Sequence, residues 1–474
     1  MWNFILETMQ NYPDSKLFSN EIIYTYSQII NMAEEHGEIL KNKLHKTAKC
    51  AILCDSGINC FLAILSCWYA GLVPIPLSVN YGVENCIKII ELTQPDILIV
   101  DTDKYRLCPY QYNITNKNIV FEKNEIIRDD SLNDVAIIMC TSGTTGIPKG
   151  IMITNYGLRL NILKINDYFK INIKDRIMIA RPVYHCAVLT GELLVSVFNG
   201  LDIGFLDEIY NPYSLLQFAL KNNITILCGT PTLFNHLSEL SQKNNIKHLI
   251  KKIAISGECL NKRNAINIRK GFPDAEIYNV YGLTEASPRV SYLPPEKYDA
   301  YSESVGIPLE GIQIKIVDQN YNELPINTKG LIMIKTPCIM KGYYKNPEMT
   351  KKVINNKWLN TGDIGFIDNN KYLYILSRAD DMIIKGGMNI YPKEIETQIE
   401  LITQIKECIA YGKKSVTGQV IALDILLNDE YKTMTKKEIM ILLSTILPAY
   451  QMPSEINITD IIKKNASGKI IRPR

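Results

Sequence analysis

Short hydrophobic runs alternate with segments of helical pattern through most of the chain. Apolar runs of strand length lie at residues 50–56 (CAILCDS), 73–77 (VPIPL) and 96–100 (DILIV). Between them, NCFLAILSCWYAG and the amphipathic ENCIKIIELTQ have the length and the pattern of helices. This alternation predicts βαβ units and a mainly parallel sheet that helices cover on both faces.

The same rhythm continues with DVAIIMCT, GIMITN, ITILCGTP and IKKIAIS and changes near Ser302. Short strands with turn signals follow (IQIKIVD, GLIMIK, KYLYILS), and a mixed tail contains IKECIAYG, QVIALDILL and the helical KKEIMILLSTILPAY. We therefore predict an α/β fold with a large N-terminal domain (1–378) of doubly covered, mainly parallel sheets and a small β-rich subdomain. A small, mobile α+β C-terminal domain (379–474) follows. Because no low-complexity linker separates the two, we expect a single hinge between Arg378 and Asp381.

The composition is that of an ordinary globular protein. Of 474 residues, 46% are hydrophobic and 21% are charged, which excludes a mainly disordered chain or a collagen-like repeat. The net charge, 52 − 49 = +3, is too small and too evenly spread to indicate nucleic acid or an anionic membrane as the main partner. The 12 cysteines include no CxxC pair and the 5 histidines are scattered, so neither a disulfide scaffold nor a zinc site is indicated. We expect a reduced, cytoplasmic setting.

One uncharged stretch, residues 56–83, is long enough to span a bilayer. Gly71, Pro74 and Pro76 interrupt it, and AGLVPIPL has the pattern of a helix end followed by a buried strand. The N-terminus carries an early acid and lacks the basic start of a signal peptide. We therefore expect no membrane span.

The segment CTSGTTGIPKG (140–150) follows a buried strand and combines glycines, hydroxyl groups and one lysine. Glycines let backbone N–H groups approach a phosphate, hydroxyls add donors, and a lysine adds positive charge. The spacing excludes a Walker A loop, because Gly143 and Gly146 are too close together and Lys149 is not followed by Ser or Thr. A flexible surface turn is the alternative. The candidate phosphate-binding residues are Thr141, Ser142, Gly143, Thr144, Thr145, Gly146 and Lys149.

This string closely resembles the TSGTTGxPKG phosphate loop of the adenylate-forming superfamily. That family includes acyl- and aryl-CoA synthetases, adenylation domains of peptide synthetases and firefly-type luciferases. Further segments resemble the family motifs in the same order: YNVYGLTEASP (278–288), NTGDIGFID (360–368), KYLYILSRADDMIIKGGMNIYPKEIE (371–396) and NASGKIIRPR (465–474). The resemblance covers nearly all of the chain and implies the fold of that family, with ATP and Mg²⁺ as cofactors.

For the nucleotide, the resemblance implies roles for five residues. Tyr281 would pack on adenine, Thr284 would bind the α-phosphate, and Glu285 would hold Mg²⁺, for which a hard carboxylate is suited. Asp363 would accept hydrogen bonds from the ribose hydroxyls, and Arg378 would contact ribose and phosphate. The residue before this arginine is serine, where the family usually has glycine, and serine fits there if its φ is negative.

The resemblance also implies two alternating arrangements of the C-terminal domain, with Asp380 as the hinge. In one arrangement Lys469 would stabilise the charge that develops during adenylation. In the other, the turn of Lys385, Gly386 and Gly387 would line a tunnel for an acceptor thiol. Taken alone, an SGK string near a terminus is also typical of a solvated tail.

Three stretches, RPVYHCAVLTGE, CGTPTLFNHL and SGECL, would contact the acid substrate. Amino-acid activators of the family carry an acid after an aromatic residue in the first stretch, where it pairs the substrate ammonium. The matching pair here is His185–Cys186, and an ammonium buried without a counter-charge is strongly disfavoured. The stretch resembles that of acyl- and aryl-CoA ligases, in which this side chain packs near the reacting carboxylate. An ordinary core histidine is the alternative for His185.

The third stretch leaves the choice of substrate open, because its Gly257–Glu258 pair occurs in amino-acid and acyl activators alike. Cys186, Cys228 and Cys259 would give the pocket a small, soft, apolar wall. This wall favours an aryl acid or a short-to-medium acyl acid.

We therefore predict an AMP-forming acid–thiol ligase. It would convert a small carboxylic acid and MgATP to acyl-AMP and pyrophosphate, and then transfer the acyl group to coenzyme A or to the phosphopantetheine of a separate carrier protein. A stand-alone amino-acid adenylation enzyme, a luciferase-like oxygenase and a non-catalytic nucleotide-binding protein of the same fold are the alternatives. The presence of Glu285, Asp363 and Lys469 disfavours the last of these.

Overall fold

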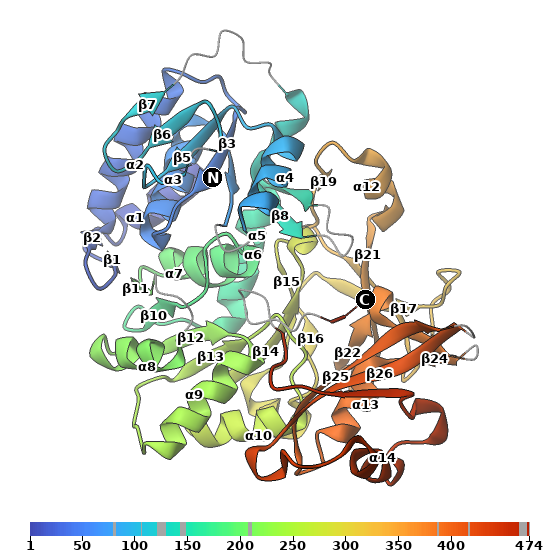
Figure 1. Ribbon diagram of the computed structural model, residues 1–474. Helices are drawn as coiled ribbons and strands as arrows, with labels where there is room; N and C mark the ends of the chain where they lie inside the picture. Colours follow the sequence, from blue (N-terminus) through green and yellow to red (C-terminus); the bar gives the residue numbers. More distant parts are fainter. Residues whose placement is uncertain are drawn as a thin grey trace.

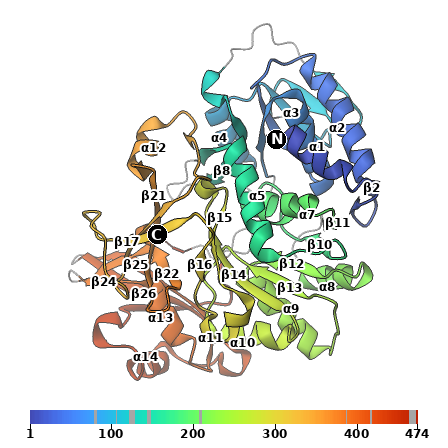
Figure 2. The same ribbon diagram turned by 180° about the vertical axis from the view of Figure 1, so that it is seen from behind.

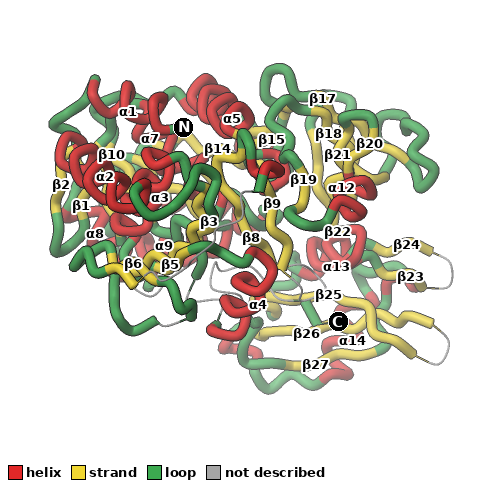
Figure 3. The backbone as a smooth tube through the Cα atoms, turned by 90° about the horizontal axis from the view of Figure 1, so that it is seen from above, coloured by secondary structure: helices red, strands yellow, loops and turns green. Residues whose placement is uncertain are grey.

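The larger part of the molecule consists of sheets and helices stacked in layers, coloured from blue through yellow to light orange in Figure 1. The residues from 383 onward gather at one side of it, and the view from above in Figure 3 shows the same arrangement. This computed structural model describes residues 1–78, 82–105, 107–120, 129–142, 148–206, 211–385, 388–415, 418–463 and 472–473.

In the first sheet, strands alternate with helices along the chain, as the hydrophobic pattern predicts. Strand β3 pairs in parallel with β4 on one side and with β5 on the other, and every residue of these three strands is buried. The spatial order is β4 (Val73–Pro76), β3 (Lys49–Leu53), β5 (Ile97–Val100), β6 (Gln111–Asn113) and β7 (Ile119–Val120). The helices of this part are α1 (Trp2–Gln10), α2 (Tyr26–Lys41), α3 (Gly57–Ala70) and α4 (Val83–Thr93).

The second sheet is larger and also mainly parallel, with antiparallel strands at its two edges. Its spatial order is β16 (Ile307–Pro308), β15 (Arg289–Tyr292), β14 (Glu276–Gly282), β13 (Lys252–Ile255), β12 (Ile226–Gly229), β10 (Arg176–Ile179), β11 (Asp202–Phe205), β1 (Lys16–Phe18) and β2 (Ile23–Thr25). The helices of this part are α5 (Asn155–Phe169), α8 (Pro212–Lys221), α9 (Pro231–Lys243), α10 (Lys262–Gly271) and α11 (Tyr298–Tyr301). Figure 2 shows α5 running beside β14 and β15.

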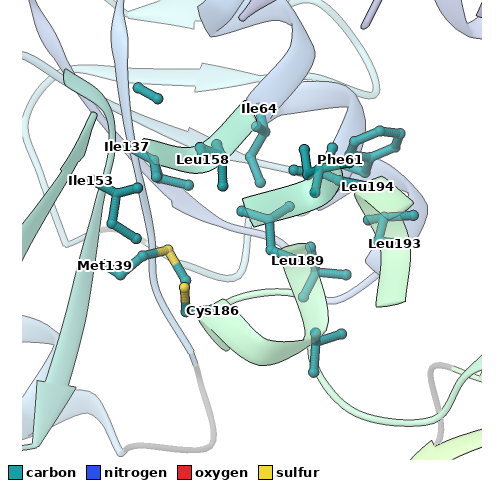
Figure 4. Close-up of a cluster of buried hydrophobic side chains, with 14 of the residues drawn as sticks. Phe61, Ile64, Ile137, Met139, Ile153, Leu158, Cys186, Leu189, Leu193 and Leu194 are labelled. Atoms are coloured by element: carbon teal, nitrogen blue, oxygen red, sulfur yellow. The ribbon is translucent and has the colours of Figure 1, made fainter. Parts of the chain in front are cut away.

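Between β10 and β11 the chain forms one helix in three consecutive pieces. They are α6 (Cys186–Val188), a π-helical segment η3 (Leu189–Leu194) and α7 (Val195–Phe198). Figure 4 shows the apolar side chains of this helix packed against α3 and α5; they are Leu189, Leu193 and Leu194, facing Phe61, Ile64 and Leu158. A π-helical segment inside an α-helix frequently marks a functional site.

Two strands depart from the βαβ expectation. β8 (Val135–Ser142) and β9 (Pro148–Thr154) are antiparallel and form a sheet of their own with β19 (Gly342–Tyr343). The hydrophobic pattern predicts both strands but not their direction, and the connection between them is too short for a parallel crossover, which needs about a dozen residues or more. As a result, Thr141 and Lys149 lie opposite one another on the two strands.

The β-rich part has the order β17 (Gln313–Val317), β18 (Gly330–Lys335), β21 (Trp358–Ile367) and β20 (Ile354–Asn355), with β22 (Leu373–Arg378) paired to β21 and helix α12 (Pro347–Val353) beside it. The β21–β22 hairpin places Asp363 opposite Arg378. Ser377 lies within β22, outside the left-handed region of φ, so serine can replace the glycine that the resemblance led us to expect.

Residues 383–463, which we call the C-terminal unit, have a hydrophobic cluster of their own that extends from Ile383 to Ile456. A short segment, η6 (Ala379–Asp381), connects this unit to β22. The unit contains the hairpin β23 (Ile383–Lys385) and β24 (Met388–Ile390), the sheet β25 (Ile405–Ser415), β26 (Gly418–Leu427) and β27 (Glu455–Ile458), and helices α13 (Pro392–Ile399) and α14 (Lys436–Ser444).

The uncharged stretch forms α3 and β4 rather than one long helix. Gly71 ends α3 with φ +72°, a left-handed conformation that favours glycine. Within the residues that the structure describes, no helix is both long and apolar enough to cross a membrane.

Candidate functional site

A cavity of about 1630 Å³ lies between the larger part of the molecule and the C-terminal unit. Thr230, Ser256 and Tyr281 line it, and they lie at the carboxyl ends of the parallel strands β12, β13 and β14. Ligands of open α/β sheets bind at this edge, outside the carboxyl ends of the strands. The position alone therefore makes the cavity the candidate site.

The structure gathers most of the predicted site residues around this cavity. Those that line it are Thr141, Lys149, His185, Cys186, Gly257, Glu258, Tyr281, Thr284, Glu285, Asp363 and Arg378. Three predicted residues are described but do not line it: Cys228, Asp380 and Lys385. The predictions for Gly143, Thr144, Thr145, Gly146, Gly386, Gly387 and Lys469, and for the side chain of Ser142, lie outside the described residues.

A connected polar cluster forms where β14 meets the β21–β22 hairpin. The Tyr281 hydroxyl donates a hydrogen bond to Asp363, and Arg378 Nη1 donates to the same carboxylate at 2.9 Å and to the Thr361 carbonyl at 2.9 Å. Gly362, with φ +71°, permits this approach, because a Cβ there would lie 2.8 Å from Arg378 Nη2. Burial, and after it the charge of Asp363, raises the pKa of the Tyr281 hydroxyl. The hydroxyl therefore stays protonated and holds the carboxylate in place.

Glu285 lies in a short helical turn, η4 (Thr284–Ala286), that follows β14. The Tyr343 hydroxyl donates a hydrogen bond of 2.9 Å to Glu285 Oε1, and Lys149 Nζ lies 5.6 Å from the centroid of the same tyrosine ring. Burial, and after it the Glu285 charge, raises the pKa of Tyr343. The cavity thus holds a carboxylate and an ammonium group around one aromatic ring.

His185, which precedes α6, also lines the cavity. Burial, and after it the positive charge of Arg181, lowers the pKa of His185 to about 3, so its imidazole is neutral at ordinary pH. Cys186 follows, and Figure 4 shows it at the edge of the hydrophobic cluster beside Met139. Thr232 and Glu258 also line the cavity, and Thr232 Oγ1 donates a hydrogen bond of 3.0 Å to Glu258 Oε2.

The predicted cysteine wall needs a correction. Cys228 lies in β12, where every residue is buried, and it belongs to the hydrophobic core instead of the cavity lining. Only Cys186 and Cys259 of the three line the cavity among the described residues. The apolar sequence pattern of a doubly covered strand does not distinguish a core position from a pocket wall.

Arg472, near the end of the chain, contacts both the cavity and the C-terminal unit. Arg472 lines the cavity and donates hydrogen bonds to both carboxylate oxygens of Glu396 on α13, at 3.0 Å for the Nη2–Oε2 pair. It also donates to the Ala410 carbonyl, and its Nε lies 3.9 Å from Asp381. A buried ion pair with a bidentate geometry fixes the end of this segment beside the cavity.

Lys385, predicted for the thiol tunnel, lies elsewhere. Its Nζ donates hydrogen bonds to the carbonyls of Met452 at 3.0 Å and Tyr450 at 3.2 Å. Its hairpin, β23–β24, lies at the outer edge of the molecule in Figures 1, 2 and 3. Among the described residues, Arg472 lines the cavity and the strands of this hairpin do not.

Several residues around the cavity were not singled out from the sequence. Tyr343 lies in MKGYYKNPEMTKK, a weaker match to the family, and Arg472 lies in the final motif. Arg181, the first residue of RPVYHCAVLTGE, and Arg289, directly after YNVYGLTEASP, also line the cavity. Their position in or beside a recognised stretch was the one available signal.

Comparisons with known proteins identify the family of the chain. A family model described as AMP-binding enzyme matches residues 5–344. The 2-succinylbenzoate–CoA ligase of Oceanobacillus iheyensis is 27% identical over 476 aligned residues, which cover 97% of this chain and 96% of that protein. A long-chain-fatty-acid–CoA ligase of Escherichia coli O6:H1 is 29% identical over 394 residues, covering 82% of this chain and 68% of that protein.

A solved structure shows the same fold. The o-succinylbenzoate CoA synthetase (MenE) of Bacillus subtilis, in complex with the acyl-adenylate intermediate OSB-AMP, has a TM-score of 0.86 at 24% identity, covering 99% of this chain and 97% of that chain. The same enzyme is also known in complex with ATP and a magnesium ion. The predicted α/β fold of adenylate-forming enzymes is thereby confirmed.

The family match covers well over half of the chain. It includes the YGLTE segment at the end of β14, which lines the cavity, and the Gly-rich sequence flanked by the cavity-lining Thr141 and Lys149. The chain therefore belongs to the family of AMP-binding enzymes.

Proposed function

We propose that this enzyme activates a carboxylic acid with ATP and transfers the resulting acyl group to a thiol. One observation carries the proposal: a single cavity is lined by Asp363 and its polar cluster, by Glu285 and Lys149, and by His185 and Cys186. The first two groups suit a nucleotide, and the third suits an organic acid. Coenzyme A, named in the relatives, is the proposed acceptor; a carrier protein's phosphopantetheine is the second candidate.

At the nucleotide end, Asp363 is the proposed ribose ligand. A carboxylate has about four acceptor positions, and Tyr281 and Arg378 use two of them, so the ribose hydroxyls can still donate to it. Tyr281 offers its ring to the adenine while its hydroxyl holds Asp363. Lys149 and Thr284 would bind phosphate oxygens.

Magnesium fits the donors that are present. The described residues contain no group of three or more His, Cys, Asp or Glu side chains that could hold a metal. Mg²⁺ in nucleotide sites is commonly held by one or two carboxylates together with phosphate oxygens and water. Glu285, oriented by Tyr343, is the carboxylate that would hold it. When bound, the ion would neutralise part of the phosphate charge.

The reaction would have two steps. In the first, a carboxylate oxygen of the acid forms a bond to the α-phosphorus, and the bond from that phosphorus to pyrophosphate breaks. In the second, the thiol sulfur forms a bond to the acyl carbon, AMP leaves, and the thiol proton passes to solvent. Lys469 would act in the first step, and the turn from Lys385 to Gly387 in the second.

These steps need two arrangements of the same chain. We propose domains at residues 1–378 and 379–474, with Asp380 as the hinge. The separate hydrophobic cluster of the C-terminal unit supports this division. The position of Arg472 at the cavity, with Lys385 at the outer edge, supports assignment of the present arrangement to the first step.

Acid-dependent exchange of labelled pyrophosphate into ATP tests the proposed function. A panel of 2-succinylbenzoate, a long-chain fatty acid and short aryl and alkyl acids should include at least one acid that supports exchange. Coenzyme A should then convert the adenylate to a thioester. Absence of exchange with every acid, in a preparation that binds ATP, would overturn the proposal.

A deaminated acid should be a better substrate than the amino acid of matching size, by about 10²-fold in exchange rate, because an ammonium would be buried without a counter-charge. The neutral His185 and the nearby Arg181 provide no such charge. Phenylalanine against 3-phenylpropanoate and alanine against propanoate are the pairs to compare. A preference for the amino acid that disappears in Glu258→Gln would instead identify a stand-alone amino-acid activator.

Asp363→Asn should raise the KM for ATP by about tenfold or more, since hydrogen bonds to a charged acceptor are lost. ATP titration of pyrophosphate release measures the change. Asp368→Asn is the matched control, because this residue lies in the turn of the same hairpin and does not line the cavity. An equal KM in wild type and Asp363→Asn would remove Asp363 from the nucleotide site.

A further inference from the structure

The larger part of the molecule and the C-terminal unit share no apolar core. In the part of the chain that the structure describes, no hydrophobic cluster contains residues from both sides of η6. The clusters of the larger part include no residue beyond Ile375, and the cluster of the C-terminal unit begins at Ile383. Domains of one chain that meet without a large hydrophobic interface move relative to one another by default. Specific polar contacts therefore decide which arrangement is favoured.

Lys329 and Glu394 form an ion pair between the two parts. Lys329 directly precedes β18 in the larger part, and Glu394 lies in the first turn of α13 in the C-terminal unit. The Lys329 ammonium also lies 5.3 Å from the centroid of the Tyr391 ring, just before the same helix. One lysine of the larger part thus makes both a charged and a cation–π contact with the start of α13.

Other contacts place the C-terminal unit in the same position. Helix α13 packs against β22, the last strand before the connection η6. Arg263 on α10 donates a hydrogen bond of 2.9 Å from Nη1 to the carbonyl of Ile405, the first residue of β25. A backbone carbonyl accepts from any donor that reaches it, whereas the Lys329–Glu394 pair requires opposite charges at two defined positions.

The ion pair belongs to the present arrangement of the two parts. The hairpin that carries Lys385 lies at the outer edge of the molecule (Figure 1), and α13 follows it directly in the chain. Hairpin and helix move together, because Ile390 of the hairpin and Ile395 of the helix lie in one hydrophobic cluster. A rotation about η6 that turns this hairpin toward the cavity therefore carries Glu394 away from Lys329, which stays with β18.

We propose that Lys329 is a positioning residue: through its ion pair with Glu394 it holds the C-terminal unit in the arrangement of the first step, and the pair opens before the thiol step. The inference rests on the proposed function, whose two steps need two arrangements. A contact that exists in only one of two arrangements shifts the equilibrium toward that arrangement. The pair therefore favours adenylation and slows acyl transfer.

A zero-length carbodiimide cross-link detects the pair directly in the full-length enzyme. The reagent activates the Glu394 carboxylate, the Lys329 amine attacks the activated carbon, and an amide bond forms while the reagent leaves as a urea. Peptide mass spectrometry should identify this link. The Lys413–Glu455 pair, which joins β25 to β27 within the C-terminal unit at 2.7 Å, is the internal standard, because it should be linked in either arrangement.

The cross-linked enzyme should still release pyrophosphate, but the amide prevents separation of Lys329 and Glu394. The ratio of thioester formation to pyrophosphate release should therefore fall by more than about tenfold, since the acceptor turn no longer reaches the acyl-AMP. Lys329→Arg is the matched control: its guanidinium keeps the ion pair but forms no amide. Other carboxylates are modified equally in both proteins, so the treated variant should keep the ratio of the untreated enzyme.

Without the reagent, Lys329→Ala and Glu394→Gln should each raise the same ratio by up to about fivefold, the range for an exposed ion pair. The half-reactions are pyrophosphate release and thioester formation from preformed acyl-AMP. The charge-swapped double variant, Lys329→Glu with Glu394→Lys, should return the ratio toward that of the wild type, because the two changes are coupled. Lys352→Ala, which removes an exposed lysine from α12, should leave it unchanged.

The outcomes separate this inference from the proposed function. Absence of the Lys329–Glu394 link in a sample in which Lys413 and Glu455 are linked would overturn the positioning role. Thioester formation at an undiminished ratio in the cross-linked enzyme would also overturn it, as would equal losses of both half-reactions in Lys329→Ala. Absence of pyrophosphate exchange with every acid would instead remove the proposed function, while the cross-link, which needs no substrate, would still report the contact.

Discussion

Replacement of Lys469 by alanine is expected to slow acyl-AMP formation by about 10²- to 10³-fold, the usual effect of removing one positioned transition-state charge. Acyl transfer from preformed acyl-AMP should remain almost unchanged, because the lysine would act only while charge develops at the α-phosphate. Lys469 lies outside the described residues, but Arg472, a few positions further along, is fixed to Glu396 at the cavity wall. Arg472, in the same motif, therefore lies at the cavity.

The two half-reactions are measured separately, by acid-dependent pyrophosphate release and by thioester formation from synthetic acyl-AMP. Lys463→Ala is the matched control, since it removes an exposed lysine from the same C-terminal stretch outside the cavity. It should leave both rates unchanged. Equal losses in both half-reactions of Lys469→Ala would contradict a role confined to the first step.

The fold could be predicted largely because local pattern and chain order determine it. The runs CAILCDS, VPIPL and DILIV form the parallel strands β3, β4 and β5. The direction of β8 and β9 was not predictable from apolar pattern, since a buried strand has the same composition in either direction. The short loop between them is the feature that decides it.

Residues of the candidate site were predictable where they lie inside a recognised motif. Tyr281, Thr284, Glu285, Asp363 and Arg378 lie in recognised segments, and they line one cavity. The bond from Tyr343 to Glu285 joins residues 58 positions apart, and a sequence gives no sign of such a pairing.

The charged residues at the cavity show the same limit of prediction from sequence. Three charged residues lie on different elements: Arg181 follows β10, Glu192 is in η3, and Arg289 is in β15. In the sequence, each of them looks like an ordinary charged residue. Arg289 packs against Gly191 of η3, and Arg181 pairs with Glu192, through contacts that only the folded chain makes. Counter-charge is a property of tertiary contacts, so the motifs alone do not give it.

Asp380→Pro is expected to preserve pyrophosphate release and to reduce thioester formation by more than about 10³-fold. Asp380 is exposed and lies in η6, the short connection between β22 and the C-terminal unit. Proline fixes φ near −65° and restricts the residue before it, so rotation about this connection is blocked. The tunnel turn would then never reach the acyl-AMP, and misplacement by even about 1 Å costs about 10²-fold.

Stopped-flow measurement of pyrophosphate release and quenched measurement of thioester formation separate the two effects. Asp380→Ala is the matched control: it removes the carboxylate but leaves the backbone free, and it should retain both activities. The present arrangement, with Arg472 at the cavity and Lys385 at the outer edge, predicts which step survives in the proline variant. Thioester formation at the wild-type rate in Asp380→Pro would show that the rotation occurs at another residue of the connection, because a backbone fixed at the true hinge cannot present both segments to one cavity.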